Sequence, residues 1–343
     1  MEKKEIEKLK SELKKYGKSS LSYLTLSNDL KIYKGDKWEG YFAYKEFMKS
    51  VVILSNPIVP KENIERAVDD LIGYFSHNKM HIAFFLATDH IIEILKNKKF
   101  NTFYFGKEAI VDLDKFDISG KQGWSIRSSV NFAKRNNMIV EEYKFKEQRD
   151  QNIENEIKKI SDEWCKIKKE PELDFAFGHV NFDNVMDERF FICKHEERIV
   201  GFIVYYPIFG INSYYLDMTR RGFNSPRGVI DFLHVESFNF LQKEGVKKIY
   251  IGFAPMSFFN YEVVKNHRSL KFLFILKPLF ELIYPAKSEL FYKKKFATDW
   301  ESNYVCFYPR VSIRSLFSLC HAVYKGGLGG LLAYKIKYLF SRK

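Results

Sequence analysis

The feature that most constrains this chain is a run of 18 residues without a charged side chain, from Ile199 to Leu216. A run of that length reaches the lower limit for a helix that crosses a bilayer. Pro207, Gly210 and neighbouring polar residues interrupt it, however, and its two ends are rich in β-branched and aromatic residues. That pattern is typical of two strands joined by a turn. The sequence therefore predicts a strand pair here and no transmembrane segment.

Strands and helices alternate on both sides of this run, which predicts an α+β fold. The order of helix, antiparallel hairpin, strand, helix and strand is compatible with an acyltransferase-type fold used twice, with mixed sheets and flanking helices. We expect the two halves to pack tightly, because no low-complexity linker separates them. The predicted divisions are a leader helix at 1–19, an N-terminal half at 20–148, a C-terminal catalytic half at 149–311 and a basic amphipathic tail at 312–343. Helices are expected at 62–77, 89–98, 125–136, 151–168 and 226–244, and strands at 40–44, 50–54, 81–87, 103–111, 190–195, 199–206, 213–218, 248–253 and 304–308.

Positive charge is concentrated at the C-terminal end of the chain. The formal net charge is +13, and residues 265–343 hold 15 lysines and arginines against four acids, a net of +11. A one-sided basic field attracts polyanions such as nucleic acid or an anionic membrane surface. In the tail, the glycine-rich stretch 326–330 separates two short amphipathic pieces. We expect this tail to lie on an anionic membrane surface; a helical pair packed on the C-terminal half is the alternative.

Several common catalytic motifs are missing. The chain has no P-loop, no zinc-binding H-E-x-x-H helix and no nucleophile elbow. The four cysteines are far apart, without zinc-like spacing, which fits a reducing cytoplasm. His77 and His81 are spaced like metal ligands on one helical face, but the residues between them favour a turn into a strand. We expect His179 and His234 to be packed or hydrogen-bonded, and we expect no metal and no cofactor.

The residues most suited to chemistry gather around one predicted strand end. Asp217 lies near the end of an aromatic strand, and Arg220 and Arg221 follow at its exit. Pro226-Arg227-Gly228 then opens a helix whose first backbone N–H groups can hold an anion. A carboxylate and guanidinium groups beside a helix N-terminus suit a substrate that carries both an amine and a phosphate. The alternative is a buried Asp–Arg pair that only holds the strand end.

Between about residues 41 and 309 the chain contains a series of short sequence motifs. Their residues and their order along the chain resemble those of the soluble catalytic domain of the aminoacyl-phosphatidylglycerol synthases, the lysyl- and alanyl-phosphatidylglycerol transferases. The resemblance implies a tandem pair of acetyltransferase-like halves and transfer of an amino acid from aminoacyl-tRNA to a lipid hydroxyl, on phosphatidylglycerol or a related acceptor. The segments are Ser55-Asn-Pro57, Phe105-Gly-Lys-Glu-Ala-Ile-Val-Asp-Leu113, Ser119-Gly-Lys121 with Arg127, Glu172 to Gly178, Val200-Gly-Phe202, Asp217-Met-Thr-Arg220, Gly228-Val-Ile-Asp-Phe-Leu233, Gly252-Phe-Ala-Pro-Met-Ser257, Tyr292-Lys-Lys-Lys-Phe296, Trp300-Glu301 and Tyr304.

The resemblance also implies roles for individual residues. Asp217 and Arg220 match the family's functional Asp/Arg pair, and Lys293 and Lys295 match its Phe-Lys-x-Lys-Phe pair with a tyrosine in place of the first Phe. Asp217 is implied to act on the amino group or the attacking hydroxyl, and the basic residues on phosphates. The predicted catalytic residues are Asp217, Arg220 and Glu281, and the predicted substrate- and phosphate-binding residues are Arg221, Lys293 and Lys295.

The implied partners are aminoacyl-tRNA as donor and an anionic membrane lipid as acceptor, with no obligate protein partner. Family members usually carry an N-terminal membrane domain that flips the lipid; the chain as given has none, so we expect it to make the lipid without flipping it. We expect a cytoplasmic protein, peripheral on the inner face of the cell membrane. Three alternatives stay open: an acyl-CoA-dependent N-acyltransferase, although the R/Q-x-x-G-x-G/A loop of that class is missing; a tRNA-dependent transfer to a cell-wall or polysaccharide precursor; and a non-catalytic module that binds tRNA or membrane.

Overall fold

The computed structural model describes residues 3–168, 187–255 and 286–323, together with the single residues 180, 182 and 257. The expected helices and strands are all present within this part of the chain, with ends shifted by a few residues. Those up to residue 143 are α1 (Lys3–Tyr16), η1 (Ser20–Leu26), β1 (Lys31–Tyr33), β2 (Phe42–Phe47), β3 (Ser50–Leu54), η2 (Lys61–Asn63), α2 (Ile64–His77), β4 (His81–Thr88), α3 (Asp89–Asn97), β5 (Asn101–Asp112), α4 (Trp124–Arg135) and β6 (Ile139–Tyr143). The later ones are α5 (Gln151–Lys168), β7 (Arg189–His195), β8 (Arg198–Ile208), η3 (Phe209–Ile211), β9 (Ser213–Arg221), α6 (Val229–Lys243), β10 (Lys248–Pro255), α9 (Ala286–Lys294), β11 (Asp299–Tyr308) and α10 (Ile313–Val323).

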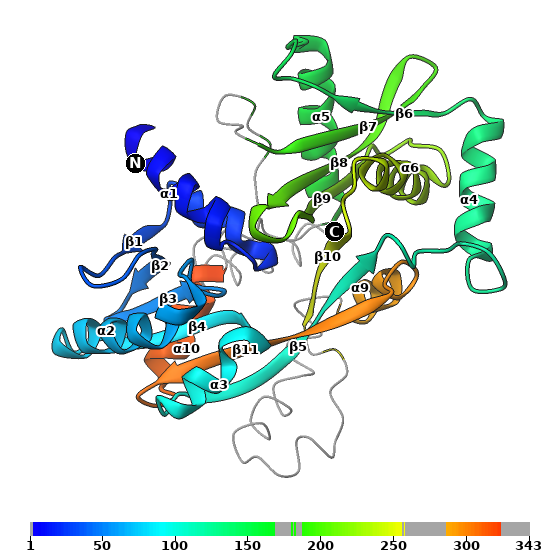
Figure 1. Ribbon diagram of the computed structural model, residues 1–343. Coiled ribbons are helices and arrows are strands. Elements are labelled where there is room, and N and C mark those ends of the chain that lie inside the picture. The colour runs from blue at the N-terminus through cyan, green and yellow to red at the C-terminus, as the bar shows by residue number, and fades with distance from the viewer. Residues whose placement is uncertain are drawn as a thin grey trace, which may run out of the picture.

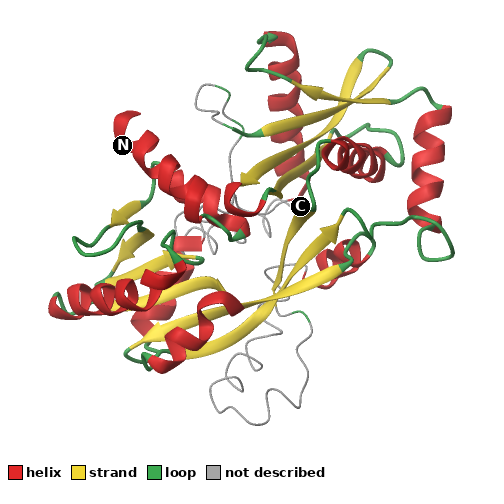
Figure 2. Cartoon of the chain, in the orientation of Figure 1, coloured by secondary structure: helices red, strands yellow, loops and turns green. Residues whose placement is uncertain are grey.

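The described strands form one continuous mixed sheet of 11 strands. Their order across the sheet is β1-β2-β3-β4-β11-β5-β10-β9-β8-β7-β6. Helices flank this sheet along its length (Figures 1 and 2). The predicted α+β architecture is confirmed, with the two expected sets of strands joined edge to edge rather than kept as separate sheets.

Two strands cross between the halves of the sheet. β6 follows the N-terminal set in the sequence but pairs antiparallel with β7. β11, from the C-terminal part, lies between β4 and β5 and pairs antiparallel with both. Because backbone N–H and C=O groups of inner strands need partners on both sides, the N-terminal set of strands is complete only with β11 in place. The division at 148 and 149 stays a prediction.

The uncharged run that opened the sequence analysis forms β8, η3 and the start of β9, as predicted. The two strands pair antiparallel. Phe202 and Val204 lie in one hydrophobic cluster and Ile203 and Tyr205 in another, so both faces of β8 are buried. A strand covered on both faces has no need of polar alternation, which explains the continuous apolar pattern. No helix in the described ranges is both long enough and apolar enough to cross a membrane.

The predicted leader helix docks on the rest of the protein. α1 buries Leu9 and Leu13. At its end the carbonyl oxygen of Gly17 accepts a hydrogen bond of 2.9 Å from the N–H of Gly210 in η3. All residues of η1, which the sequence did not predict, are buried. The leader therefore joins the N-terminal strands to the C-terminal ones instead of fraying.

The described start of the basic tail packs on the N-terminal strands. α10 contacts β2, β3 and β4. Ser318 Oγ donates a 2.9 Å hydrogen bond to the carbonyl of Phe47, whose ring stacks on His321 at 3.7 Å between ring centres. Ile313 and Phe317 stay exposed. This packing differs from the alternative of a helical pair on the C-terminal half, and residues 324–343 lie outside the described residues.

Gly228 combines two constraints at the start of α6. It has a φ of +85°, and a Cβ at this position would lie 2.7 Å from the carbonyl oxygen of Ser129 in α4. Gly245, just after α6, has a φ of +84°, but a Cβ there would meet no atom within 4 Å. The two glycines therefore share the left-handed conformation, and only Gly228 has the close approach.

We predict that Gly228→Ala lowers the free energy of unfolding more than Gly245→Ala. The second substitution should cost about 1–2 kcal/mol for the left-handed conformation alone. The first should cost more, because α4 and α6 must also move apart. Urea unfolding of both variants measures the difference, and equal losses would contradict the close packing of the two helices.

Candidate functional site

The strand end that the sequence singled out lies where two parallel strands part. β9 and β10 pair in parallel at two positions, Tyr214 with Ile249 and Tyr215 with Tyr250. Both strands then continue, to Arg221 and Pro255, without further pairing to each other in the described residues. Their backbone groups beyond this point are therefore available to partners other than the neighbouring strand.

Asp217 lies in an irregularity just beyond the last of these pairs. On β8, the adjacent residues Val204 and Tyr205 pair with Met218 and Leu216 of β9, so Asp217 is the extra residue of a β-bulge. A bulge turns a side chain away from the regular alternation and is often found beside active sites. The sequence predicted the strand and the carboxylate but not the bulge.

The corresponding pair in the N-terminal strands is closed. β3 and β4 pair in parallel along all five residues of β3. Past its end, the N–H of Ser55 donates to the carbonyl of Phe85 at 2.7 Å. The Asn56 side chain donates to Thr88 Oγ1 at 2.9 Å and accepts from the Thr88 N–H at 3.0 Å. These bonds hold β3 and β4 together where β9 and β10 part, so the candidate site belongs to the C-terminal half.

Asp217 is half-buried and lies among phenol groups. Burial raises the pKa of Tyr206 well above its usual range, and the negative charge of Asp217 raises it further. The ring of Tyr206 packs on Tyr23 of η1, with 5.1 Å between ring centres. A carboxylate in such a poorly solvated setting interacts strongly with an amine or a transferable proton.

Arg220 is held in place by α5. Its Nη1 donates to Ser161 Oγ, and its guanidinium carbon lies 5.1 Å from the ring centre of Trp164. Arg221, the last residue of β9, is exposed. The structure therefore brings Asp217, Arg220 and Arg221 to one end of β9, with Arg220 fixed and Arg221 open to solvent.

Lys293 lies under β10. Its Nζ donates a 2.5 Å hydrogen bond to the carbonyl of Phe253, and only 7% of the residue is exposed. Gly252, with a φ of +92°, makes room for it, since a Cβ there would lie 3.4 Å from this Nζ. Burial lowers the pKa of Lys293, against the opposing charge of Glu289 at 3.8 Å.

Lys295 is engaged by a carboxylate of α6. Its Nζ lies 2.8 and 2.9 Å from the two carboxylate oxygens of Asp231. Lys293 and Lys295 thus tie the C-terminal end of α9 and the turn after it to β10 and to α6, respectively. Glu281, the third predicted catalytic residue, lies outside the described residues. A phosphate-binding role for either lysine stays a prediction.

Two acids, the buried Glu108 and the half-buried Glu301, were quoted within the family segments but given no role. They face each other on β5 and β11. Glu108 is 2% exposed, accepts a 2.7 Å hydrogen bond from Ser20 Oγ, and has no partner for its Oε1 among the described residues. Burial raises the pKa of Glu108 to about 8 and that of Glu301 to about 7. The sequence feature that could have identified Glu108 is an acidic side chain directly before the apolar residues Ala109 to Val111 of a strand.

The histidines do not form a metal site in the described residues. α2 ends at His77 and β4 begins at His81, so the turn predicted between them is confirmed. His234 is fully buried beside Phe238 and Phe296, and burial lowers its pKa to about 3. It is packed as expected, without the hydrogen bond that was the other expectation. No group of three His, Cys, Asp or Glu residues in those ranges could hold a metal ion, and His179 lies outside them.

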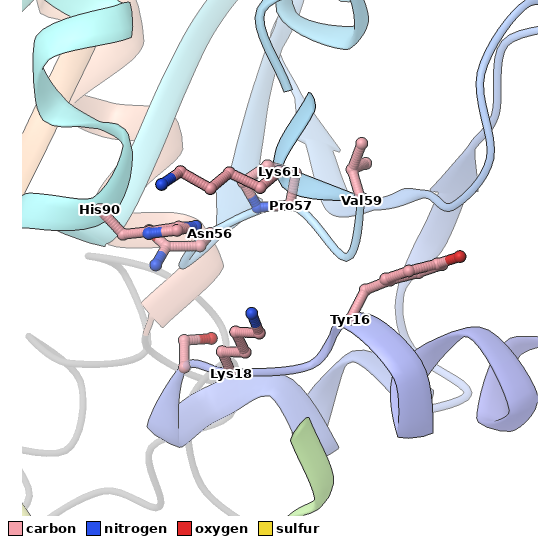
Figure 3. A pocket seen from close by; sticks show the side chains of 8 residues that line it. Tyr16, Lys18, Asn56, Pro57, Val59, Lys61 and His90 are labelled. Carbon is pink, nitrogen blue, oxygen red and sulfur yellow. The ribbon is translucent and has the colours of Figure 1, made fainter. Parts of the chain in front are cut away.

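A small cavity of about 30 Å³ lies where the leader meets the ends of β3 and β4. Figure 3 shows Lys18 of the leader on one side and Asn56, Lys61 and His90 on the other. Burial lowers the pKa of His90, and the charges of Lys18 and Lys61 lower it further. The volume is sufficient for little more than a water molecule.

Comparison with known proteins identifies the family of this chain. Residues 10–307 match the model of the family described as phosphatidylglycerol lysyltransferase, C-terminal. The chain belongs to this family. A phosphatidylglycerol lysyltransferase of Bacillus subtilis (strain 168) is 24% identical over 89% of the chain, and one of Staphylococcus aureus (strain COL) is 22% identical over 88%. The chain spans 35% and 36% of the lengths of these two curated relatives.

Solved structures of this family share the fold. The C-terminal domain (DUF2156) of an Agrobacterium fabrum protein superposes with a TM-score of 0.80 at 19% identity, covering 94% of this chain and 97% of that one. L-PGS from Bacillus licheniformis gives a TM-score of 0.75 at 22% identity, covering 91% and 94%. The predicted mixed sheet with flanking helices is thereby confirmed as the fold of this chain, and its division into two acetyltransferase-like halves stays a prediction.

Glu108 generates a prediction about pH. Its pKa is about 8 in the folded protein and close to the ordinary value of 4.5 once unfolded, so folding binds a proton between these values. Its contribution to stability is therefore full below about pH 4.5 and is lost as pH rises to about 8. We expect Glu108→Gln, which keeps an acceptor for Ser20, to remove this part of the dependence.

The measurement is urea unfolding of wild type and Glu108→Gln between about pH 5 and pH 8. As pH rises, the free energy of unfolding of the variant should increase relative to that of wild type. The change should be about 1.4 kcal/mol per pH unit at most, the value for one proton. Glu301 is present in both proteins, so its own titration largely cancels. A difference that does not change with pH would contradict a protonated Glu108.

Proposed function

We propose that the chain transfers an aminoacyl group from aminoacyl-tRNA to a hydroxyl of phosphatidylglycerol or a related lipid, at the inner face of the cell membrane. The observation that carries the proposal is the position of Asp217. It is the extra residue of a bulge, half-buried beside Tyr206, at the end of β9 where β10 parts from it. Membership of the family supplies the substrate class.

The proposed reaction is a transesterification. The oxygen of the lipid hydroxyl bonds to the ester carbonyl carbon, the bond from that carbon to the tRNA ribose oxygen breaks, and the lipid hydroxyl proton ends on the ribose oxygen. Asp217 is suited to take this proton or to hold the amino group of the aminoacyl moiety. Arg220, fixed by Ser161 and Trp164, is suited to face a phosphate or the oxyanion of the intermediate without having to be ordered first.

The remaining basic residues differ in whether their side chains already have partners in the protein. Arg221 is exposed and can reach a ligand directly. Lys295 is held by Asp231 and Lys293 by the carbonyl of Phe253, so in this proposal their first effect is to hold α9 against β10 and α6. Direct contact with a phosphate would require either lysine to exchange its present partner.

The start of α6 favours a tRNA donor over acyl-CoA. Acyltransferases of the CoA-dependent class cradle the pyrophosphate in a glycine-rich loop at this helix. Here Gly228 is used for the close approach of α6 to Ser129 in α4. The preceding residues, Arg220 to Ser225, contain one glycine and none of the spacing that the loop requires.

We predict that Asp217→Asn lowers kcat by about 10²–10⁴-fold, the usual contribution of a positioned acid or base. The assay follows radiolabel from aminoacyl-tRNA into extracted lipid, with several amino acids tested. Asp29→Asn, at an exposed position, is the matched control and should keep full activity. Near-normal turnover of a folded Asp217→Asn protein would contradict the catalytic role of Asp217. A lack of lipid labelling by wild type would contradict the proposed function.

We further propose that the tail adds membrane affinity. Residues 324–343 carry five lysines and arginines and no acid. Each contributes about 1 kcal/mol near an anionic surface, so deletion after Val323 should lower affinity for phosphatidylglycerol vesicles by roughly three orders of magnitude at low salt. This deletion keeps α10, which packs on β2 to β4.

Vesicle flotation measures the effect of the deletion. Vesicles of phosphatidylcholine alone are the control, and the thermal midpoint reports whether the shortened protein is folded. If the shortened protein is folded and floats as well as the full chain, the tail has no such role.

A further inference from the structure

The outer face of α4 carries an unusual stripe of side chains. A surface hollow of about 320 Å³ lies along this helix and is closed at one side by Arg227, from the segment before α6. The helix residues that line it are Trp124, Arg127, Ser128, Asn131, Phe132 and Arg135.

The spacing of these residues is that of one helix face. They recur at intervals of three and four residues, the pattern that an amphipathic helix normally turns toward the core. The core-facing positions of α4 are instead Ile126, Ser129, Val130 and Ala133, which are buried. Trp124 is 65% and Phe132 37% exposed. Large rings on a rigid helix are thus presented to solvent along a stripe of about 16 Å.

Three arginines accompany the exposed rings. No carboxylate in the described residues lies within ion-pair distance of Arg127, Arg135 or Arg227. Arg127 donates to the carbonyl of Gly120 at 2.7 Å and to that of Ile118, which fixes its guanidinium beside the hollow. Its charge lowers the pKa of Asp117, but the hydrogen bonds from Ser119 have the larger effect on that carboxyl.

This chemistry selects a single-stranded nucleic acid. Flat rings stack on bases of any sequence, and arginines bind the phosphates between them. A membrane-binding helix would instead need a continuous apolar face of Trp, Phe or Leu, with its lysines and arginines on the opposite face. The only aliphatic side chains of α4 face the core, and two polar residues, Ser128 and Asn131, separate the rings.

The hollow lies beside the segment that follows β9. α4 packs on α6, and Arg227 stands six residues beyond Arg221 at the end of β9. Figure 1 shows α4 at the rim of the molecule beside α6. These two helices pack on one face of the sheet, whereas Tyr206 beside Asp217 and α5 beside Arg220 pack on the other. A 3′ end held on α4 would therefore reach these residues past the end of β9, where β10 has parted from it.

We propose that the outer face of α4, with Arg227, binds the unpaired 3′-terminal nucleotides of aminoacyl-tRNA, with bases on Trp124 and Phe132 and phosphates on the arginines. This inference rests on the proposed function and names the surface that receives its donor. It assigns to α4 a role in donor binding rather than in the transfer step.

The test compares a tRNA acceptor-stem minihelix that carries its unpaired 3′ nucleotides with the same minihelix trimmed to a blunt end. Fluorescence anisotropy of each labelled RNA gives Kd with the full chain. Wild type should prefer the tailed minihelix. Trp124→Ala should weaken its binding roughly 5- to 150-fold, the range for one stacked base, and leave the blunt minihelix unaffected.

A second variant tests the contribution of the arginine charges to RNA binding. Arg135→Gln with Arg227→Gln should reduce the slope of log K against log salt by about 1.4, the value for two phosphates of a single strand. The matched control is Tyr74→Ala with Arg66→Gln, an exposed ring and arginine on α2. This control should change neither the preference nor the slope.

The transfer assay separates this inference from the proposed function. If wild type labels lipid but Trp124→Ala binds the tailed minihelix normally, the donor-binding role of α4 is contradicted and the proposed function is not. Equal losses for tailed and blunt minihelices, or a loss of binding to phosphatidylglycerol vesicles with unchanged RNA binding, would also overturn it. A higher KM for aminoacyl-tRNA at unchanged kcat is the supporting kinetic result. If wild type shows no preference for the tailed minihelix and no lipid labelling, both proposals fail.

Discussion

The hydrogen bonds of β5 with two neighbours hold the rest of the structure in register. β5 pairs with β11 on one side and with β10 on the other, and β11 in turn pairs with β4. A strand from the C-terminal part of the chain thus completes the N-terminal strands, while β6 makes the reverse exchange. Because inner-strand backbone groups cannot be left unpaired, this arrangement fixes β10 relative to both halves. The pairing of β10 with β5 shifts register between Tyr250 and Phe253, where Gly252 lies, and Lys293 donates to the carbonyl of Phe253 at this place.

The same arrangement brings charged groups into the interior. Glu108 on β5 faces Glu301 on β11, and Lys293 lies close enough to lower the pKa that burial gives Glu108. Water is excluded there, so the folded protein keeps Glu108 protonated near neutral pH rather than bearing two unpaired carboxylates. The junction between the halves is therefore polar, and its charge depends on pH in the range where the protein would work.

The two pairs of parallel strands in the sheet differ at their ends. β3 and β4 are held together past their last pair by Ser55, Asn56 and Thr88, whereas β9 and β10 part after two pairs. Within the described ranges, open backbone groups, a bulged carboxylate and a fixed guanidinium occur together where β9 and β10 part. We propose different surfaces for the donor and for the membrane: α4 for the 3′ nucleotides of the tRNA and the tail for the anionic bilayer surface.

The sequence by itself determined most of the helices and strands and the family, but not η1, β1, β6 or α9. The uncharged run at 199–216, the helix predicted at 62–77 and the ordered motifs from Ser55 to Tyr304 depend on neighbouring residues, and each can be read along the chain. It also located Asp217, Arg220 and Arg221 at one strand end. Only the tertiary structure decided that Asp217 is a bulge residue, that Lys295 is paired with Asp231, and that Glu108 is buried opposite Glu301. Register, ion pairing and desolvation arise between residues far apart in the chain, which meet only when strands such as β5, β10 and β11 come together.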